Sequence, residues 1–322
     1  MSEGILISTT MLVLGIETSC DETAAAVVKD GRKVLSNIVA SSLKLHRQYG
    51  GVIPEIASRS HIETIAVVTR RALNDAGCSL QDLGLICVTT NPGLIGSLLV
   101  GISFARALSL ALGIPVKEVD HVAAHLYANF LDGKTPQIPA VGLVVSGGHT
   151  SLYYLKNLSE LRLIGHTFDD AAGEAFDKVA KILGLGYPGG PIIERLAKKG
   201  DPQKVRFSCA AFSGALNFSF SGIKTAVLYY VRGKWERRRV KREDICASFQ
   251  EAVVGELARK AICACREKRV KTLLVGGGVA ANSRLREVLT QEANKNKIKL
   301  YCPKKEFCLD NAAMVAGKGA LQ

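Results

Sequence analysis

Two histidines spaced four residues apart, His121 and His125, lie in the segment VDHVAAHLYAN. If this segment is helical, both imidazoles lie on one face, a spacing that suits a single metal ion. A two-histidine site commonly takes a carboxylate as its third ligand. Asp310 in EFCLDNAAM is a candidate because it opens an apparent helix, where it could instead serve as the N-cap. The three residues predict a metal site whose ligand set fits Fe²⁺ or Zn²⁺.

A histidine pair with this spacing also occurs in metalloproteases, which are therefore an alternative explanation. Their signature places a glutamate general base directly after the first histidine. That position is occupied by Val122 in this chain. The histidine pair therefore does not indicate a protease.

Two glycine-rich segments could bring backbone N–H groups close to an anion. VVSGGHT resembles a phosphate-binding turn to which Ser146 and His149 add donors, and it also resembles an ordinary hairpin turn. In LLVGGGVAANSRLRE, a strand ends in three glycines and is followed by Asn282 and a helix, an arrangement that lets a nucleotide approach the backbone. Neither segment is a Walker P-loop or a GxGxxG fingerprint, so kinases and dehydrogenases of those two types are disfavoured.

The segment GEAFDKVAKILGLGYPGGPIIERLA combines an amphipathic helix with a glycine–proline loop. Asp177 lies among apolar neighbours in the helix, and Gly189-Gly190-Pro191 predicts a rigid, open turn. A surface acid and an ordinary loop would explain the two features equally well.

The hydrophobic pattern predicts an α/β architecture with helices packed on central sheets. VLGIETSCDETAAAVV and AVGLVVSGGHTSLYYL each read as a strand, a polar turn and a second strand, roughly 130 residues apart, which hints at a duplicated lobe. PEIASRSHIETIAVVTRRALNDAG and IGSLLVGISFARALSLALGI read as helices that end near a glycine. Strands are expected in LGLICVTTNPG, IPVKEVD, KTLLVGGG and IKLYCP.

The composition favours a polyanionic partner. The 322 residues carry a formal charge of +13, and 48% are hydrophobic, enough for about two domains with a sizeable core. The densest basic cluster lies beside the only tryptophan, Trp235, and is either a solvated surface or an RNA contact; it comprises Arg237, Arg238, Arg239, Lys241 and Arg242. Nine cysteines without a Cys-x-x-Cys pair predict free, buried thiols in a reducing compartment.

The beginning of the chain has no features of a secretory or transit signal. MSEGILISTT carries one acid and no base, and we interpret it as a short tail before a first strand at Met11. No apolar run is expected to reach the roughly 18 residues of a membrane span. We therefore expect a cytoplasmic protein with no membrane partner.

Taken together, these segments resemble the universal tRNA threonylcarbamoyladenosine synthase family in its bacterial TsaD form, once described as an O-sialoglycoprotein endopeptidase. The resemblance covers most of the chain from Met11 onward, in family order. The matching stretches are GIETSCDETAAAVV, HRQYGGVIPEIASRSHIE, TTNPGLIGSLLVGISFARALS, DHVAAHLYAN, VVSGGHT, DDAAGEAFDKVAKILGLGYPGGPIIE, FSFSGIKTA, LLVGGGVAANSRLR and LDNAAM.

The resemblance implies an actin/Hsp70-like ATPase-domain fold, with two ribonuclease-H-like lobes around a nucleotide cleft. We expect a tail at 1–10, an N-terminal lobe at 11–120 and a C-terminal lobe at 121–307. A terminal helix at 308–322 would carry a metal ligand and cross back to the N-terminal lobe. The two hairpins would then supply the phosphate-facing turns.

The resemblance also assigns roles to individual residues. The implied ligands of one divalent metal ion, Fe²⁺ by family resemblance with Zn²⁺ as the alternative, are His121, His125 and Asp310. Glu194 falls where the family places a further acidic residue, commonly aspartate in bacterial members, so its residue type departs from the family pattern. The implied substrate contacts are Val144, Val145, Ser146, Gly147, Gly148, His149, Asp177, Gly190, Glu194 and Asn282.

The implied reaction moves a threonylcarbamoyl group from threonylcarbamoyl-AMP to the exocyclic amine of an adenine in tRNA. The acceptor is the base immediately 3′ of the anticodon (position 37), in tRNAs reading codons that begin with A, and AMP is released. Asp21 and Glu22, in the first hairpin turn, would face the cleft and accept the amine proton or orient the metal-bound group. The alternative is that both carboxylates only bind N–H groups of the turn.

The implied partners are a paralogous actin-like subunit (TsaB), an ATPase subunit (TsaE) and an upstream synthase of the carbamoyl adenylate (TsaC). We expect helices at 59–76 and 94–112 to dock the paralogue and Gly101→Arg to weaken pairing. Two other functions share the fold: an ATP-hydrolysing or sugar-phosphorylating enzyme, which would use carboxylates around Mg²⁺, and a non-catalytic scaffold, which would lack the histidine pair.

Overall fold

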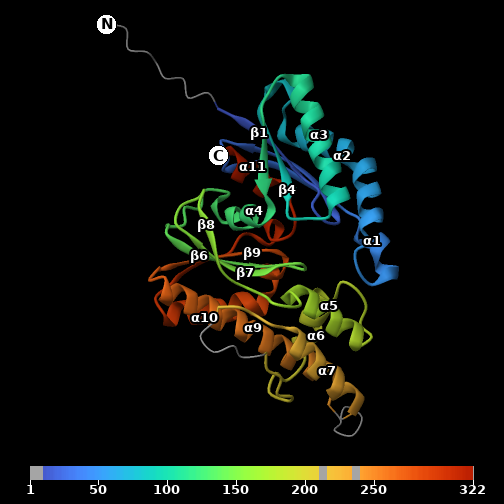
Figure 1. The fold of residues 1–322 in the computed structure, drawn as a ribbon, viewed down its shortest axis with the longest axis vertical. Helices are drawn as coiled ribbons and strands as arrows, with labels where there is room; N and C mark the ends of the chain where they lie inside the picture. Colours follow the sequence, from blue (N-terminus) through green and yellow to red (C-terminus); the bar gives the residue numbers. More distant parts are fainter. Residues whose placement is uncertain (1–9, 210–215, 234–239, 322) are drawn as a thin grey trace.

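The computed structural model describes residues 10–209, 216–233 and 240–321 of the chain. These residues form two five-stranded mixed sheets, stacked along the long axis of the molecule and covered by helices (Figure 1). The expected α/β architecture is therefore confirmed.

The first sheet has the strand order β3-β2-β1-β4-β5. Strands β1, β2 and β3 form an antiparallel meander, and β4 and β5 run parallel to β1. The predicted first hairpin is thus confirmed. The strands are β1 (Leu12–Glu17), β2 (Glu22–Lys29), β3 (Lys33–Ser41), β4 (Leu83–Asn91) and β5 (Val116–Asp120).

Both faces of this sheet are buried. Leu14 and Ile16 of β1 pack toward α2 (Pro54–Ala76) and α3 (Ile95–Leu112). Val13, on the opposite face of the strand, packs toward α11 (Ala312–Ala320). Because alternate side chains enter two different cores, the strand reads as an unbroken apolar run rather than an alternating one.

The helices of the first lobe end where the sequence predicts. Gly77 closes α2 in the left-handed conformation and donates its N–H to the carbonyls of Asn74 and Leu73. Gly113 closes α3 in the same way. Glycine adopts this conformation without strain, which is why it marks both helix ends. Between β3 and α2 lie the short helix α1 (Leu43–His46) and a 3-10 turn, η1 (Arg47–Tyr49); a second 3-10 turn, η2 (Leu80–Asp82), precedes β4.

The second sheet repeats the topology of the first. Its order is β10-β9-β6-β7-β8, with an antiparallel meander from β6 to β8 and with β9 and β10 parallel to the meander's first strand. This correspondence supports the duplication suggested by the two hairpins. The strands are β6 (Ala140–Val145), β7 (Thr150–Leu155), β8 (Leu161–His166), β9 (Thr272–Gly276) and β10 (Lys299–Tyr301).

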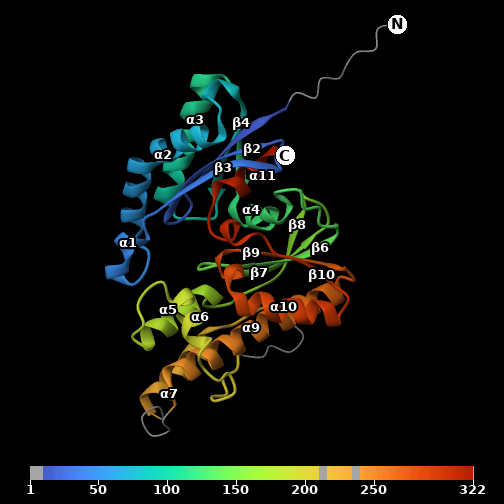
Figure 2. The same ribbon diagram turned by 180° about the vertical axis from the view of Figure 1, so that it is seen from behind.

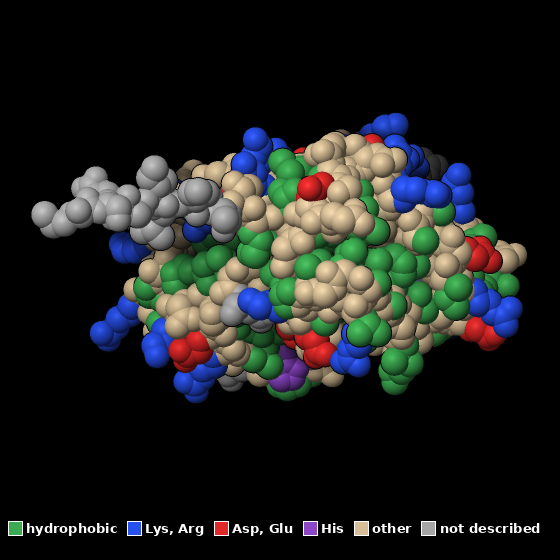
Figure 3. All heavy atoms as spheres, turned by 90° about the horizontal axis from the view of Figure 1, so that it is seen from above, with side chains coloured by type: hydrophobic (Ala, Val, Ile, Leu, Met, Phe, Trp, Pro, Cys, Tyr) green, Lys and Arg blue, Asp and Glu red, His purple; other side chains and the backbone are tan. Residues whose placement is uncertain are grey.

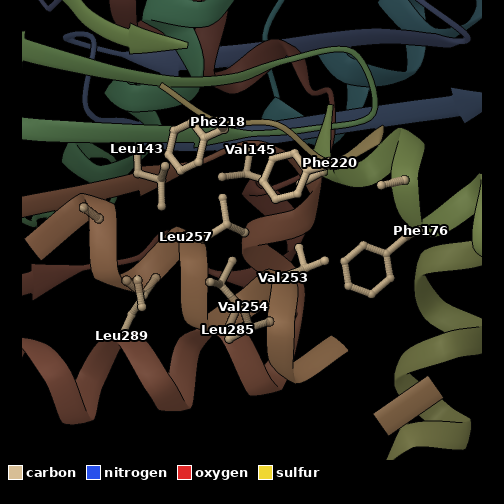
Figure 4. Packing of buried hydrophobic residues seen from close by; sticks show 14 of the residues in the cluster. Leu143, Val145, Phe176, Phe218, Phe220, Val253, Val254, Leu257, Leu285 and Leu289 are labelled. Atoms are coloured by element: carbon tan, nitrogen blue, oxygen red, sulfur yellow. The ribbon is translucent and has the colours of Figure 1, made fainter. Parts of the chain in front are cut away.

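One face of the second sheet packs on α9 (Arg242–Glu267) and α10 (Ser283–Lys295). Figure 4 shows Leu143 and Val145 of β6 close to Phe218, with Leu257 of α9 and Leu285 of α10 below them. Three further helices extend this lobe at one end: α5 (Ala172–Ile182), α6 (Gly189–Ala197) and α7 (Ser221–Gly233).

The helix α4 (His121–Tyr127) joins the two halves of the molecule. It contacts β4 and β5 of the first sheet, β6 and β9 of the second, and α11 at the end of the chain. Figure 2 shows α4 and α11 next to each other between the sheets. The 3-10 turns η3 (Ala128–Phe130), η4 (Gly278–Ala281) and η5 (Lys305–Phe307) complete the fold. Any metal ligands on α4 are therefore held by both sheets, and a ligand at the start of α11 is held by the first sheet and by α4.

The expectation that no apolar run is long enough to span a membrane is wrong. Helix α3 has 18 residues and is apolar enough to cross a membrane by length and composition. It is the one such helix in the described ranges, and a single helix of this kind is weak evidence for a membrane span. Its face toward β4 is buried at Ser97, Leu98, Gly101 and Ala105.

Candidate active site

Helix α4 carries both histidines and is buried along its whole length. Asp120 begins it as N-cap: its Oδ1 accepts a hydrogen bond from the N–H of Ala123 at 2.8 Å. The other oxygen of Asp120 accepts from the side chain of Asn91 at 2.7 Å, which ties the helix to the end of β4. His121 and His125 lie one turn apart, with ring centroids separated by 4.5 Å. The predicted shared helical face is confirmed.

Asp310 meets the two histidines from the far end of the chain. Its Oδ1 lies 3.1 Å from Nε2 of His125 and 3.4 Å from Nε2 of His121. One ligand atom from each of the three residues lies within 4.8 Å of the others. Two imidazole nitrogens and one carboxylate oxygen, each able to offer a lone pair to one point, form a donor set that fits a divalent ion.

The alternative role of Asp310 as a helix cap is wrong. Asn311 is the N-cap of α11, and its side chain accepts a hydrogen bond from the N–H of Met314 at 3.1 Å. Because the neighbouring asparagine satisfies the helix terminus, the carboxylate of Asp310 is left to the histidines.

Close backbone approaches bring the three ligands together. A Cβ on Gly276, where β9 ends, would lie 2.6 Å from the carbonyl oxygen of His125. A Cβ on Gly15, in β1, would lie 2.8 Å from the backbone nitrogen of Ala316 in α11. Only glycine permits such contacts, so both sheets are pressed against the helices that carry or follow the ligands.

Glu17 is a site residue that sequence reasoning missed. It ends β1 and is completely buried, and its Oε2 lies 3.0 Å from Nδ1 of His121. Ser19 donates its N–H to Oε1 at 2.6 Å, and Thr89 donates its hydroxyl to Oε2 at 2.6 Å. The signal available in the sequence was a carboxylate that ends an otherwise apolar strand directly before a polar turn.

The ligands perturb one another's protonation. Burial alone would lower the pKa of His121, but the carboxylates of Asp310 and Glu17 raise it well above the ordinary value. Burial likewise opposes ionisation of Asp310, yet His121 and His125 hold its pKa far below the ordinary range. The pKa of His125 is lowered by burial and by the charge of His121.

The first hairpin turn lies close to this group. The Asp21 carbonyl accepts hydrogen bonds from the N–H and the hydroxyl of Ser42, at 3.0 and 2.8 Å. Burial, together with the negative charges of Asp310 and Asp21, raises the pKa of Glu22 to about 9. Ser41 donates its hydroxyl to Glu22 at 3.1 Å. The turn therefore brings the carboxyl group of Glu22 within electrostatic reach of Asp310.

The second hairpin turn leaves room for a ligand. The Ser146 N–H bonds to the carbonyl of His149 at 2.8 Å, and the His149 N–H bonds back to the Ser146 hydroxyl at 3.1 Å. A Cβ on Gly147 or Gly148 would meet no atom within 4 Å. Val144 and Val145 are fully buried in β6, where both pair with β7 and Val144 also pairs with β9. Burial and the nearby charge of His121 lower the pKa of His149.

The predicted open turn at Gly189-Gly190-Pro191 is wrong, because these residues form the first turn of α6. Asp177 Oδ1 accepts the N–H of Gly189 at 2.7 Å, which satisfies a free donor at that helix terminus. Burial raises the pKa of Asp177, although the N–H groups of Gly189 and Gly190 oppose the change. A Cβ on Gly190 would meet no atom within 4 Å, so this terminus is open to a ligand.

Glu194 and Asn282 join α6 to α10. Glu194 accepts the N–H of Ser283 at 3.0 Å. Asn282 is the N-cap of α10, accepting the N–H of Leu285 at 3.0 Å and donating to the side chain of Gln250 at 2.9 Å. Both side chains are thus already engaged at a helix N-terminus, a place where backbone donors favour anions.

Tyr187, just before α6, was also missed. Burial raises its pKa, and the carboxylates of Asp177 and Asp21 raise it further. Asp177 lies in α5 and Asp21 in the first hairpin turn, so carboxylates from two distant parts of the chain act on this phenol.

Part of the predicted basic cluster cannot be placed: Trp235 and Arg237 to Arg239 lie outside the described residues. Lys241 and Arg242 begin α9, where Lys241 is the N-cap residue. All nine cysteines are free, as predicted, but only four of them are buried and the other five are half-buried.

Gly101 does not lie on an outward docking face. A Cβ there would be 3.4 Å from Cβ of Thr18, and its contact with the Thr18 hydroxyl would be closer still, so the residue points toward the first hairpin turn. Figure 3 shows hydrophobic side chains across the middle of the face seen from above, with lysines and arginines at its margin. The large apolar side chains that α2 and α3 expose are Ile62, Val67, Ile95, Leu99 and Leu110.

The family model for TsaD, described as tRNA N6-adenosine threonylcarbamoyltransferase, matches residues 33–317. The chain belongs to this family. It is 52% identical over 310 residues to the tRNA N6-adenosine threonylcarbamoyltransferase of Caldicellulosiruptor saccharolyticus, covering 96% of this chain and 92% of the relative. The corresponding protein of Thermosipho africanus is 51% identical over 310 residues, covering 96% and 93%. Members of the TsaD family are transferases that act on tRNA, and so is this chain.

Solved structures resemble this TsaD family member in fold alone. Component A of the Acidaminococcus fermentans (R)-2-hydroxyglutaryl-CoA dehydratase has a TM-score of 0.59 and 16% identity, covering 97% of this chain and 98% of its own. T. kodakarensis HypF has a TM-score of 0.62 and 15% identity, covering 97% and 47%. The ROK hexokinase of Thermus thermophilus has a TM-score of 0.53 and 16% identity, covering 96% and 97%. The predicted actin/Hsp70-like ATPase fold is confirmed.

Proposed function

We propose that the protein transfers the threonylcarbamoyl group of threonylcarbamoyl-AMP to N6 of the adenine 3′ of the anticodon (position 37). The substrates would be tRNAs that read codons beginning with A. The observation that carries the proposal is the convergence of both histidine Nε2 atoms on one oxygen of Asp310, next to the first hairpin turn. An actin-like fold with this histidine–carboxylate group differs from a phosphotransferase, whose Mg²⁺ is held by oxygen ligands.

We infer that His121, His125 and Asp310 hold one Fe²⁺ or Zn²⁺ ion. Their two nitrogens and one oxygen suit either ion, and both histidines are buried. A divalent ion in this place would polarise an oxygen of the donor as a Lewis acid.

The donor's nucleotide part is assigned to the second lobe. The backbone of Val144 to Gly148 and the side chain of His149 would contact its phosphate, since Gly147 and Gly148 leave space above the turn. Asp177, Gly190, Glu194 and Asn282 would complete the cleft at the N-termini of α6 and α10. The side chains of Asp177, Glu194 and Asn282 accept N–H groups at these helix N-termini, and the positive ends of the two helix dipoles favour an anionic adenylate there.

The acceptor amine is a poor nucleophile because its lone pair is delocalised into the adenine ring. In the proposed step the amine nitrogen bonds to the carbamoyl carbon, the carbon–oxygen bond to phosphate breaks, and AMP departs with the electron pair. We assign acceptance of the amine proton to Asp21. In the metal-free protein, burial and the charges of Asp310 and Asp21 raise the pKa of Glu22 to about 9, which favours Asp21 over Glu22 as the acceptor.

The lobes are proposed as residues 11–120 and 121–307, with 308–322 returning to the first lobe. This division is supported by the contacts of α11 with β1, β2 and β4. The apolar face of α2 and α3 would bind the paralogous subunit TsaB, with TsaE joining the complex and TsaC supplying the donor. With tRNA as substrate we propose a cytoplasmic location.

The metal-dependent reaction is tested with His121→Ala, using His166→Ala as the control. His166 is an exposed histidine of β8 in the second lobe. Purified parent and control should contain stoichiometric Fe or Zn, and nucleoside mass spectrometry should detect threonylcarbamoyladenosine in tRNA from cells complemented with either. His121→Ala should lose both. A variant that retains metal and modification overturns the ligand assignment, and ADP or phosphate release without tRNA would favour an ATP-hydrolysing enzyme.

The pairing face is tested with Leu99→Arg, using Leu163→Arg as the control. Both leucines are exposed, on α3 and β8 respectively. Light scattering after size exclusion should show that Leu99→Arg abolishes pairing with the paralogue, whereas the control pairs like the parent. Unchanged pairing of Leu99→Arg would move the interface elsewhere.

A further inference from the structure

Glu17 has more polar contacts than its place at a strand end requires. It is completely buried, and its two oxygens accept hydrogen bonds from Ser19 and Thr89. It is not among the three residues whose ligand atoms converge. A buried carboxylate is costly unless it is hydrogen-bonded, and these contacts hold its oxygens in fixed directions.

One of the two oxygens of Glu17 faces the ring of His121. Oε2 of Glu17 lies 3.0 Å from Nδ1 of His121, on the side of the ring away from Asp310. A neutral imidazole carries a single N–H, so binding an ion through Nε2 requires the proton on Nδ1. Glu17 is placed to accept that proton's hydrogen bond. The hydroxyl of Ser19, 3.2 Å from the same nitrogen, lies beside it.

His125 lacks a comparable contact. Its Nε2 faces Asp310, but within the part of the chain that is described its Nδ1 is buried without a hydrogen-bond partner. The two histidines are therefore supported differently. His125 is fixed by the packing of α4 against β9, whereas His121 is fixed by a carboxylate.

We propose that Glu17 is a positioning residue for the metal: it holds the Nδ1–H of His121 and thereby aims the Nε2 lone pair at the ion. This inference rests on the proposed metal site. Groups that hold the second nitrogen of a ligating histidine fix its tautomer and orientation and make it more basic, and losing one weakens metal binding by about 10–100-fold.

The test is the Zn²⁺ affinity of metal-free protein, measured by competition with a chromophoric chelator. Glu17→Gln keeps the shape of the side chain and should weaken Zn²⁺ binding by about 10–100-fold. Glu118→Gln is the matched control, because Glu118 is exposed on β5 of the same lobe and pairs with Arg106 at 2.9 Å. The control should bind like the parent.

The outcomes separate the two proposals. If the parent itself binds no stoichiometric Zn²⁺, the metal site is wrong. If the parent binds and Glu17→Gln binds equally well, the metal site stands and the role of Glu17 is refuted.

A second measurement needs no Glu17 variant and so does not depend on its folding. The Zn²⁺-loaded parent, labelled with ¹⁵N in histidine, should show a slowly exchanging proton on Nδ1 of His121 and a metal-bound Nε2. The signal is assigned by its loss in His121→Ala. Observation of the ion on Nδ1, or of no retained Nδ1 proton, would overturn the inference.

Discussion

Substituting Gly15 by alanine should damage the metal site although Gly15 touches no ligand. The added Cβ would lie 2.8 Å from the Ala316 backbone nitrogen and 2.9 Å from its Cβ, and still closer to the carbonyl oxygen of Ala312. Ordinary contact begins near 3.4 Å. Since backbone atoms cannot rotate away, α11 must shift until these contacts are restored. Overpacking of this kind costs about 1–3 kcal/mol, and we expect the upper end.

The displaced helix begins two residues after Asp310. Metal ligands tolerate only about 0.2 Å of error in their distances, so we expect Zn²⁺ affinity to fall about tenfold or more. Urea unfolding of the metal-free protein, followed by circular dichroism, measures the stability loss. Chelator competition measures the affinity.

Gly84→Ala is the control for this substitution. Gly84 is also in a strand of the first sheet, but its added Cβ would meet the flexible side chain of Met11 at 3.2 Å. Its effect should stay within about 0.5 kcal/mol. If Gly15→Ala is as stable as the parent, the close backbone packing of α11 on β1 is refuted. Lost stability with unchanged Zn²⁺ affinity would refute the link from that packing to Asp310.

Three further predictions concern the cleft. Asp177→Ala should lower the free energy of unfolding in urea by about 0.5–2 kcal/mol, because the N–H of Gly189 loses its acceptor. Asp177→Asn keeps an acceptor oxygen and should be about as stable as the parent. Equal losses in the two variants would refute the capping role. In metal-free protein, folding raises the pKa of Glu22 from 4.5 to about 9, so the stability that protonated Glu22 contributes should be lost as pH rises from about 5 to 9. Unfolding curves at pH 5, 7 and 9 should show that Glu22→Gln flattens this decline. A pH dependence of stability equal to that of the parent would contradict the prediction. The basic cluster is tested by replacing Arg237, Arg238, Arg239, Lys241 and Arg242 with serine. The KM for all tRNAs should rise alike and the salt dependence of tRNA binding should flatten, while affinity for the AMP-linked donor is kept. A KM and a salt dependence equal to those of the parent would show that tRNA binds elsewhere.

Much of the fold was predictable because its signals are local. The two hairpins combine apolar strands with polar turns, and α2 ends at a glycine in the left-handed conformation. The four-residue spacing of His121 and His125 likewise fixes a shared face once the segment is helical. Each of these features depends on neighbours a few residues away, so the sequence contains the whole cause.

The errors arose where the outcome depends on distant contacts. Gly189 and Gly190 looked like a loop, but Asp177, twelve residues earlier, accepts the N–H of Gly189 and completes a helix start. Gly101 looked like part of an exposed face, yet Thr18 packs against it from another element. Local composition cannot indicate which side of a helix the rest of the chain will cover.

The sequence by itself determined which residues could bind a metal, and through family resemblance it named all three. Only the tertiary structure decided how they meet. Asp310 reaches His125 across 185 residues because α11 returns to β1 between the sheets. The same packing sets Glu17 behind His121 and turns Nε2 toward Asp310. The orientation of a histidine ring depends on the atoms that surround it in space. Those atoms come from distant parts of the chain, and they become neighbours only when the two sheets pack on α4.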